Sequence, residues 1–347
     1  MFQDITLEDL LEARKSGEHT VIDVRSPKEY EEATIPGSIN IPVFTNAERA
    51  EVGTLYRQKG QDAAKARGLE LFSAKLPHFI QDFKNIQTPK TVFCWRGGMR
   101  SKTAATVLDL MGIHANRLTG GIRTYRKWVV DFLEHTTFSP ELIVLNGFTG
   151  TGKTKLLEKL KVEGYPVIDL EGLANHRGSI FGQIGKKPSN QKRFDALLTE
   201  DIIRYRDEAF VFVEGESKRI GRAVMPDFLY QKKEQGIHIY VELPIEERIR
   251  NILVDYHPEE YPEQIDEAFQ IIKKRIHTPV AKQIEESLHK REYVTAVQLL
   301  LQYYYDPRYK HSISQEQQLT IQANDVDDAF NKLKALYPLN RNNRGIS

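Results

Sequence analysis

The feature that most constrains the fold is the segment Gly147 to Thr154, GFTGTGKT, which has a G-x4-G-K-T pattern. It follows the apolar run Leu142 to Leu145 and precedes a helical pattern from Lys155 to Glu163. Such a loop wraps phosphate groups with backbone amides, and it works between the end of a strand and the N-terminus of a helix. The segment therefore predicts a phosphate site carried by a parallel α/β sheet.

The side chains of this loop have separate expected roles. Lys153 is expected to reach the terminal phosphates, and the Thr154 hydroxyl to ligate Mg²⁺. The apolar strand Phe210 to Val213 ends at Glu214, with Glu216 two residues later. Either carboxylate has the place of an acid that holds such a metal through water. The glycines that let the backbone approach the phosphates are Gly147, Gly150 and Gly152.

A second polar loop follows the predicted strand Pro166 to Leu170 and runs from Glu171 to Gly185. In open α/β sheets, loops at the carboxyl ends of strands line the ligand crevice. This loop mixes charged residues with glycines, which favours contact with a substrate or metal over packing. The candidate residues here are Asp169, near the end of the strand, and Glu171, His176 and Arg177 of the loop.

The only cysteine, Cys94, begins another oxyanion loop, Cys94 to Ser101, CWRGGMRS. The loop lies between the strand Thr91 to Phe93 and a predicted helix, whose N-terminus favours a thiolate. Cys94 and Arg100 are the predicted catalytic pair, and the loop residues alone leave sulfur, selenium and phosphate chemistry open. The predicted anion-binding residues are Arg96, Gly97, Gly98 and Ser101.

The length of 347 residues and the two loops predict two domains, because each loop needs its own strand and helix. The predicted bounds are 1–135, with a helical insert at about 45–80, and 136–347, with a helical C-terminal extension. A net charge of +1 gives no overall signature of nucleic-acid binding. The apolar runs are too short to cross a bilayer, and the first residues lack a signal-peptide pattern, so a cytoplasmic protein without membrane attachment is expected.

The first domain resembles a rhodanese domain in Val21 to Arg25, Pro36 to Pro42 and the cysteine loop. Most single-domain rhodaneses have one residue fewer between the cysteine and the arginine. The C-x5-R length found here is that of the rhodanese-fold dual-specificity phosphatases. A thiophosphate, a selenophosphate and a phosphate ester therefore all remain open as ligands.

The order of the two domains, their loops, and the segments Glu48 to Tyr56 and Val213 to Gly221 resemble the bacterial tRNA 2-selenouridine synthase family. This resemblance implies an α/β fold. A rhodanese-like domain would be followed by a doubly wound parallel sheet of the P-loop NTPase type, with a helical C-terminal region.

The resemblance also implies a tRNA-modifying transferase that converts 2-thiouridine at the wobble position to 2-selenouridine through S-geranyl-2-thiouridine. Its co-substrates would be geranyl diphosphate and selenophosphate, the latter from a selenophosphate-producing enzyme, with Mg²⁺ as cofactor. The P-loop would hold the departing diphosphate. Cys94 would take selenium while Arg100 and the loop amides hold the phosphate.

Two other function classes remain. One is a P-loop kinase fused to a rhodanese-fold phosphatase or sulfurtransferase, which predicts ATP turnover and, for a phosphatase, a general acid near Cys94. The other is a nucleotide-responsive switch in which Cys94 is dispensable. For tRNA binding, the second domain offers Lys273 to Arg275, Lys290-Arg291, and Tyr303 to Tyr305 with Arg308. Clustered tyrosines are more often packing than base-stacking residues.

Overall fold

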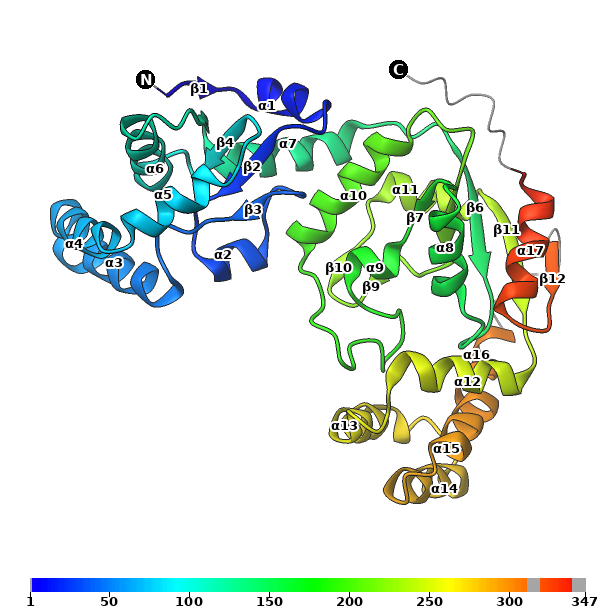
Figure 1. Ribbon diagram of the computed structural model, residues 1–347. Helices are drawn as coiled ribbons and strands as arrows, with labels where there is room; N and C mark the ends of the chain where they lie inside the picture. The colour runs from blue at the N-terminus through cyan, green and yellow to red at the C-terminus, as the bar shows by residue number, and fades with distance from the viewer. Residues whose placement is uncertain (1, 311–318, 339–347) are drawn as a thin grey trace. The chain divides into compact units, whose positions relative to one another are not determined.

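The structure is a computed structural model that describes residues 2–310 and 319–338 (Figure 1). The chain forms two compact units. The first comprises Met1–Thr136 and Lys192–Glu200, and the second comprises Thr137–Gln191 and Asp201–Ser347. No helix within the described ranges is both long and apolar enough to span a membrane.

The first unit is built on a five-stranded parallel sheet with the order β1-β5-β4-β2-β3. The apolar strands lie at its centre, where β-branched residues are buried on both faces. The strands are β1 (Asp4–Ile5), β2 (Thr20–Asp23), β3 (Ile39–Asn40), β4 (Lys90–Phe93) and β5 (Asn116–Leu118). The surrounding helices are α1 (Leu7–Arg14), α2 (Pro27–Glu32), α6 (Met99–Leu110) and α7 (Gly121–His135).

The segment predicted as a helical insert forms three helices, α3 (Asn46–Lys59), α4 (Gln61–Ser73) and α5 (Leu76–Lys84). The first begins at a capping box, in which Thr45 and Glu48 each bind the other's backbone amide. Phe72, Phe79 and Phe83 of α4 and α5 join the core around β2 and β4. The insert is thus part of the hydrophobic core of the first unit.

The second unit has another five-stranded parallel sheet, with the order β12-β11-β6-β8-β7. The chain leaves the central strand β6 to build both sides of the sheet, so the predicted doubly wound sheet is confirmed (Figure 1). In such sheets ligands bind at the carboxyl ends of the strands, where the order reverses. The strands are β6 (Glu141–Asn146), β7 (Val167–Ile168), β8 (Phe210–Glu214), β11 (Ile237–Glu242) and β12 (Leu319–Gln322).

Further elements connect these strands or flank the sheet. A two-stranded antiparallel ribbon joins β9 (Arg219–Ile220) to β10 (Ala223–Val224). The connecting helices are α8 (Lys153–Val162), α9 (Leu170–Ala174), α10 (Gln191–Tyr205), α11 (Asp227–Glu234) and α12 (Ile245–Tyr256), and α17 (Val326–Leu336) follows β12. Helix α10 carries residues of both units.

The predicted helical C-terminal region is confirmed and has a hydrophobic cluster of its own, centred on Phe269, Ile272 and Ile284. This cluster is coloured yellow to orange in Figure 1. Its elements are α13 (Pro262–Lys273), α14 (Thr278–His289), α15 (Tyr293–Leu300), the π-helical turn η1 (Leu301–Tyr305) and α16 (Asp306–Lys310).

Candidate active sites in the two loops

The cysteine loop connects β4 to α6, as its sequence context predicted (Figure 1). Cys94 is buried, and its Sγ lies 3.2 Å from the Oγ of Ser101, which is also buried. Gly98 is the residue that precedes the first turn of α6 and is exposed. The thiol therefore lies at the base of a loop whose rim opens beside a helix N-terminus, where backbone amides favour an anion.

Arg100 does not present a free charge, because Glu29 of α2 binds it through two hydrogen bonds of 2.5 and 3.1 Å. Burial raises the pKa of Glu29, but the hydrogen bond and charge of Arg100 outweigh it and lower that pKa to about 2. The sequence did not single out Glu29, since nothing in its local pattern indicates a partner 71 positions away. An anion in this loop must compete with Glu29 for Arg100.

Two other arginines lie at this loop. Arg96 is exposed on its rim. Arg117, which sequence reasoning missed, donates to the Gly97 carbonyl at 3.0 Å and forms an ion pair with Asp4. The hydrogen bond with Asp4 raises the pKa of Arg117. Arg117 of β5 is thus a cation held in place at the cysteine loop.

Backbone packing fixes the loop against the start of α7. The Ile122 amide donates to the Cys94 carbonyl at 2.9 Å. Gly121 has a φ of +59°, and a Cβ on it would lie 2.3 Å from the same carbonyl oxygen. Gly97 has a φ of +65° and is also packed tightly, although less closely than Gly121, since its Cβ would lie 3.0 Å from the Gly120 amide nitrogen. Only glycine fits such a close approach.

A pocket of about 1790 Å³, partly open to solvent, lies between the helical insert and the cysteine loop. The insert contributes Arg49, Tyr56 and Arg57, and the start of α6 contributes Met99 and Arg100. Tyr56 is 60% exposed and Met99 is 54% exposed. Exposed apolar groups among several cations are the combination that holds an unstacked nucleotide.

The P-loop connects β6 to α8, and helix α12 holds its backbone. The Arg248 Nε donates to the Thr149 carbonyl at 2.9 Å, and the Asn251 side-chain amide donates to the Gly150 carbonyl at 3.0 Å. Arg248 is buried, and Asp306 balances its charge through two hydrogen bonds. These residues, which sequence reasoning missed, fix two peptide groups of the phosphate loop.

The predicted P-loop residues come together as the motif requires. The Lys153 Nζ lies 3.2 Å from the Gly147 carbonyl oxygen, above the start of the loop. Gly147, Gly150 and Gly152 all have positive φ, and a Cβ on any of them would come within 2.7 Å of a neighbouring atom. Their lack of a side chain is therefore a steric requirement of this loop.

The carboxylate beside the P-loop threonine belongs to Glu171. The Thr154 hydroxyl donates to Glu171 Oε2 at 3.0 Å. Burial, followed by the charge of Glu216, raises the pKa of Glu171 to about 7, although Lys153 acts in the opposite direction. Atoms of both carboxylates lie close to Gly178, whose Cβ would be 2.4 Å from Glu216 Oε2 and 2.7 Å from Glu171 Oε1. Two acidic groups therefore gather next to the phosphate loop.

Glu214, one of the two acids predicted to hold the metal, is fully buried at the end of β8. Its Oε2 accepts the Leu170 amide at 2.8 Å. Burial raises its pKa well above the usual range, and the charge of Asp169 adds to this effect. Asp169 itself caps α9 by accepting the Gly172 amide at 2.7 Å. Both residues hold the strand ends in place, which leaves Glu171 as the acid in contact with Thr154.

His176 and Arg177 shape the predicted substrate loop. His176 is buried against Gly182 and Gly221, and burial lowers its pKa. The Arg177 guanidinium donates to the carbonyls of Ile184 and Asp255, and it lies 4.6 Å from the centre of the Tyr256 ring. The loop is thereby tied to α12. Among the described residues, no group of three or more His, Cys, Asp or Glu side chains is arranged to hold a metal ion.

The close contact of Gly121 with Cys94 predicts a specific loss of stability. Gly121→Ala adds a methyl group 2.3 Å from the Cys94 carbonyl, whereas Gly112→Ala has the same kind of positive φ, +72°, with nothing within 4 Å. We expect Gly112→Ala to lower the free energy of unfolding by about 1–2 kcal/mol from backbone strain, and Gly121→Ala by about 3 kcal/mol or more because overpacking adds to that strain. Urea unfolding measures the free energy of unfolding of both variants. Equal losses of stability would contradict the close contact of Gly121 with the Cys94 carbonyl.

The raised pKa of Glu171 predicts how stability depends on pH. Its folded value of about 7 exceeds the ordinary 4.5, so the folded chain retains a proton that the unfolded chain loses between these values. Stability should therefore fall as pH rises from about 4.5 to 7, by up to about 1.4 kcal/mol per pKa unit. Glu171→Gln should flatten this dependence in thermal unfolding, while Glu158→Gln on the exposed face of α8 should not. If the stability of Glu171→Gln depended on pH as steeply as that of the wild type, the buried, acidic surroundings described for Glu171 would be wrong.

Comparison with known proteins places both units. Residues 140–337 match the family model of the tRNA 2-selenouridine synthase AAA domain, and residues 6–127 match the rhodanese-like domain. A tRNA 2-selenouridine synthase of Shewanella woodyi is 30% identical over 87% of this chain and 90% of its own length. One of Bdellovibrio bacteriovorus is 32% identical over 84% of this chain and 88% of its own. One of Nitrosomonas eutropha is 35% identical over 72% of this chain, which spans 66% of that relative. The family predicted from the sequence is thereby confirmed, and the chain belongs to the tRNA 2-selenouridine synthase family.

Proposed function

We propose that this chain converts 2-thiouridine at the wobble position of tRNA to 2-selenouridine in two steps, one at each loop. Membership of the tRNA 2-selenouridine synthase family supports the overall reaction. The observation that carries the two steps is the presence of two separately built anion loops in one chain, one with a thiol and one with a lysine, a threonine and a carboxylate. The proposal places the enzyme in the cytoplasm, where its tRNA substrate is found.

In the first step the P-loop binds geranyl diphosphate. The sulfur of 2-thiouridine attacks C1 of the geranyl group, a C–S bond forms, and the bond from C1 to the diphosphate oxygen breaks. Lys153, the loop amides and the N-terminus of α8 stabilise the negative charge that develops on the departing diphosphate. The alkylated sulfur is then a better leaving group than a thiocarbonyl.

Mg²⁺ fits this site as a partner of the diphosphate. Thr154 and Glu171 provide two oxygen donors that lie 3.0 Å apart. Mg²⁺ commonly takes one or two protein oxygens and completes its shell with phosphate oxygens and water, so a cage of three acidic side chains is not required. When bound, the ion supplies positive charge to the leaving diphosphate. Glu171, with a pKa of about 7, loses its proton readily when such a cation binds.

In the second step the cysteine loop binds selenophosphate. Selenium forms a bond to C2 of the uridine, the C2–S bond breaks, and geranylthiol leaves. Water takes the phosphoryl group, which is released as phosphate. Arg96, Arg117 and the loop amides provide the positive environment for the anion, and Cys94 lies at the base of the same loop, where the selenium is held.

The engaged state of Arg100 disfavours the phosphatase alternative. A C-x5-R phosphatase needs its arginine fork to hold the three phosphate oxygens. Here Glu29 occupies both arms of that fork. A transfer reaction in which several cations share the binding of the anion requires less of Arg100. Such a reaction agrees better with the ion pair between Arg100 and Glu29.

Separate substitutions in the two loops test the two steps. Purified protein is incubated with 2-thiouridine tRNA, geranyl diphosphate, Mg²⁺ and selenophosphate, and the nucleosides are weighed by mass spectrometry. Lys153→Ala should slow geranylation by about 100-fold or more, yet still selenate tRNA that is already geranylated. Cys94→Ser should accumulate the geranylated nucleoside. Lys161→Ala, an exposed lysine on the same helix, is the control. Selenation by Cys94→Ser at the normal rate would exclude a role for the thiol.

The pocket beside the cysteine loop generates a prediction for tRNA binding. Tyr56 is exposed among Arg49, Arg57 and Arg100, whereas Tyr303, at 54% exposure, is the exposed member of the C-terminal tyrosine cluster. Loss of one stacked base costs about 1–3 kcal/mol. Tyr56→Ala should therefore weaken tRNA affinity by about 5-fold to 150-fold, and Tyr303→Ala should leave it unchanged. Filter binding at fixed salt measures the tRNA affinity of both variants. If Tyr303→Ala weakened binding and Tyr56→Ala did not, the tRNA-binding surface would lie on the C-terminal helices instead.

A further inference from the structure

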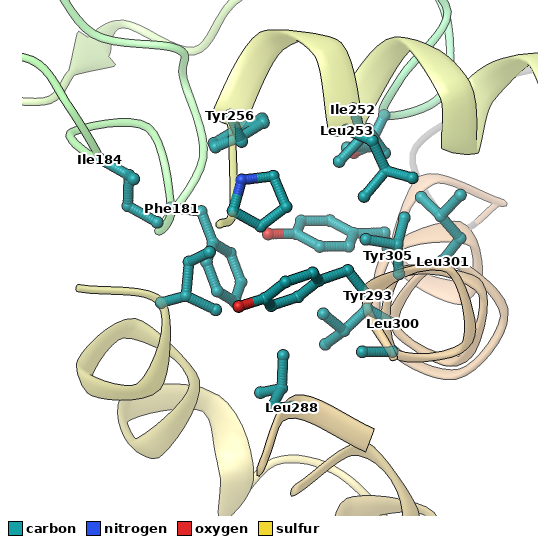
Figure 2. A pocket seen from close by; sticks show the side chains of 15 residues that line it. Phe181, Ile184, Ile252, Leu253, Tyr256, Leu288, Tyr293, Leu300, Leu301 and Tyr305 are labelled. Atoms are coloured by element: carbon teal, nitrogen blue, oxygen red, sulfur yellow. The ribbon is translucent and has the colours of Figure 1, made fainter. Parts of the chain in front are cut away.

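An apolar pocket in the second unit begins at the P-loop. Its empty space is about 570 Å³, part of it open to solvent. Figure 2 shows the rings of Phe181, Tyr293 and Tyr305 around its centre, with aliphatic side chains above and below them. Thr149 of the P-loop is one of the lining residues. A site for phosphate and a site for hydrocarbon are therefore adjacent.

One helix connects the two sites. Arg248 and Asn251 of α12 hold the carbonyls of the P-loop, and the next residues, Ile252 and Leu253, line the apolar pocket. Ile252 also packs against the P-loop backbone, because its Cδ1 lies 2.9 Å from where a Cβ on Gly150 would be. The P-loop and the apolar pocket are therefore adjacent and share α12 as a common support.

The lining decides which class of ligand fits. A nucleotide presents a ribose and a base that need hydrogen-bond partners, and leaving such groups unpaired in an apolar site is costly. Apart from Thr149 and the tyrosine hydroxyls, the pocket is lined by aliphatic and aromatic side chains and one proline. Tyr256, one of these tyrosines, has its hydroxyl bonded to Ser179 at 3.1 Å. A hydrocarbon chain attached to a diphosphate suits both halves of the site.

We propose that this pocket binds the isoprenoid chain of geranyl diphosphate and that its depth sets the chain length accepted, an inference that rests on the proposed function. The far end is formed by Leu288 of α14, which Figure 2 shows on the opposite side of the rings from Ile252 and Leu253. Leu288 is 7% exposed. A larger residue there shortens the pocket, and a smaller one extends it.

The test compares dimethylallyl, geranyl and farnesyl diphosphates as donors to 2-thiouridine tRNA. Each buried methylene changes affinity by about fourfold, so a five-carbon difference is readily measured. Leu288→Phe should lower kcat/KM for geranyl diphosphate by about 10-fold or more and leave dimethylallyl diphosphate unchanged. Leu288→Ala should raise the farnesyl-to-geranyl ratio by about 10-fold. Ile276→Ala, also 7% exposed and in the same cluster but outside the pocket lining, should alter neither ratio.

A second variant and a second measurement distinguish a narrowed pocket from a folding defect. Val297 lines the pocket and is only partly buried, so Val297→Trp narrows the pocket with less effect on the core. It should reduce use of geranyl diphosphate while inhibition by inorganic diphosphate stays unchanged. Lys153→Ala, in contrast, should lose inhibition by inorganic diphosphate.

The outcomes separate the two levels of the proposal. If wild-type protein alkylates thiouridine with none of the three donors, the proposed function fails. If wild-type protein uses geranyl diphosphate but the Leu288 and Val297 variants lower kcat/KM for all three donors equally, the isoprenoid chain binds elsewhere. The pocket assignment is then overturned. Saturable ATP binding that Val297→Trp abolishes would overturn it too.

Discussion

The second unit depends on a buried cation, Arg248. Its guanidinium is balanced by Asp306 and its Nε binds the Thr149 carbonyl, so one side chain joins α12, α16 and the P-loop. A buried charge without a partner is strongly destabilising, whereas a fully bonded one holds its neighbours in a single arrangement. Because the turn of α12 that holds the loop is followed by Ile252 and Leu253, the same helix orients the phosphate site and forms the wall of the apolar pocket. The structure of both sites therefore rests on the position of α12.

The two loops manage charge in different ways. At the cysteine loop, positive groups are already partnered: Arg100 by Glu29, and Arg117 by Asp4 and the Gly97 carbonyl. Such pairing keeps the arginines ordered, so an anion that binds them would have to displace their present partners. At the P-loop the negative groups are crowded instead, and Glu171 has a pKa near neutrality beside Glu216. In the proposed reaction, a divalent cation that binds with the diphosphate would relieve that crowding and would link cofactor binding to substrate binding.

Several structural features were predictable from particular residues. The strand–loop–helix context of Cys94 and of Gly147 to Thr154 was predicted correctly. Each loop pattern is informative only between an apolar strand and a helix, and the sequence shows both of these patterns on either side of each loop. The doubly wound sheet followed from alternating strand and helix patterns. The acid beside Thr154 was less predictable, since Glu214 and Glu216 occupy the expected sequence position while Glu171, from a different loop, makes the contact with Thr154. The tyrosine cluster proved mixed: Tyr304 is buried, Tyr305 lines the pocket and Tyr303 is exposed.

By itself the sequence determined the two anion loops, the α/β class and the family, because these are written in short contiguous patterns whose chemistry is local. Tertiary structure alone decided the partners: Glu29 for Arg100, Asp306 for Arg248, and the assembly of α12, α14 and α15 around an apolar pocket. Those pairings join residues tens of positions apart, and no local periodicity specifies them. Burial then sets the pKa of Glu171 and Glu214, since desolvation depends on what packs around a carboxyl group and not on its neighbours in sequence.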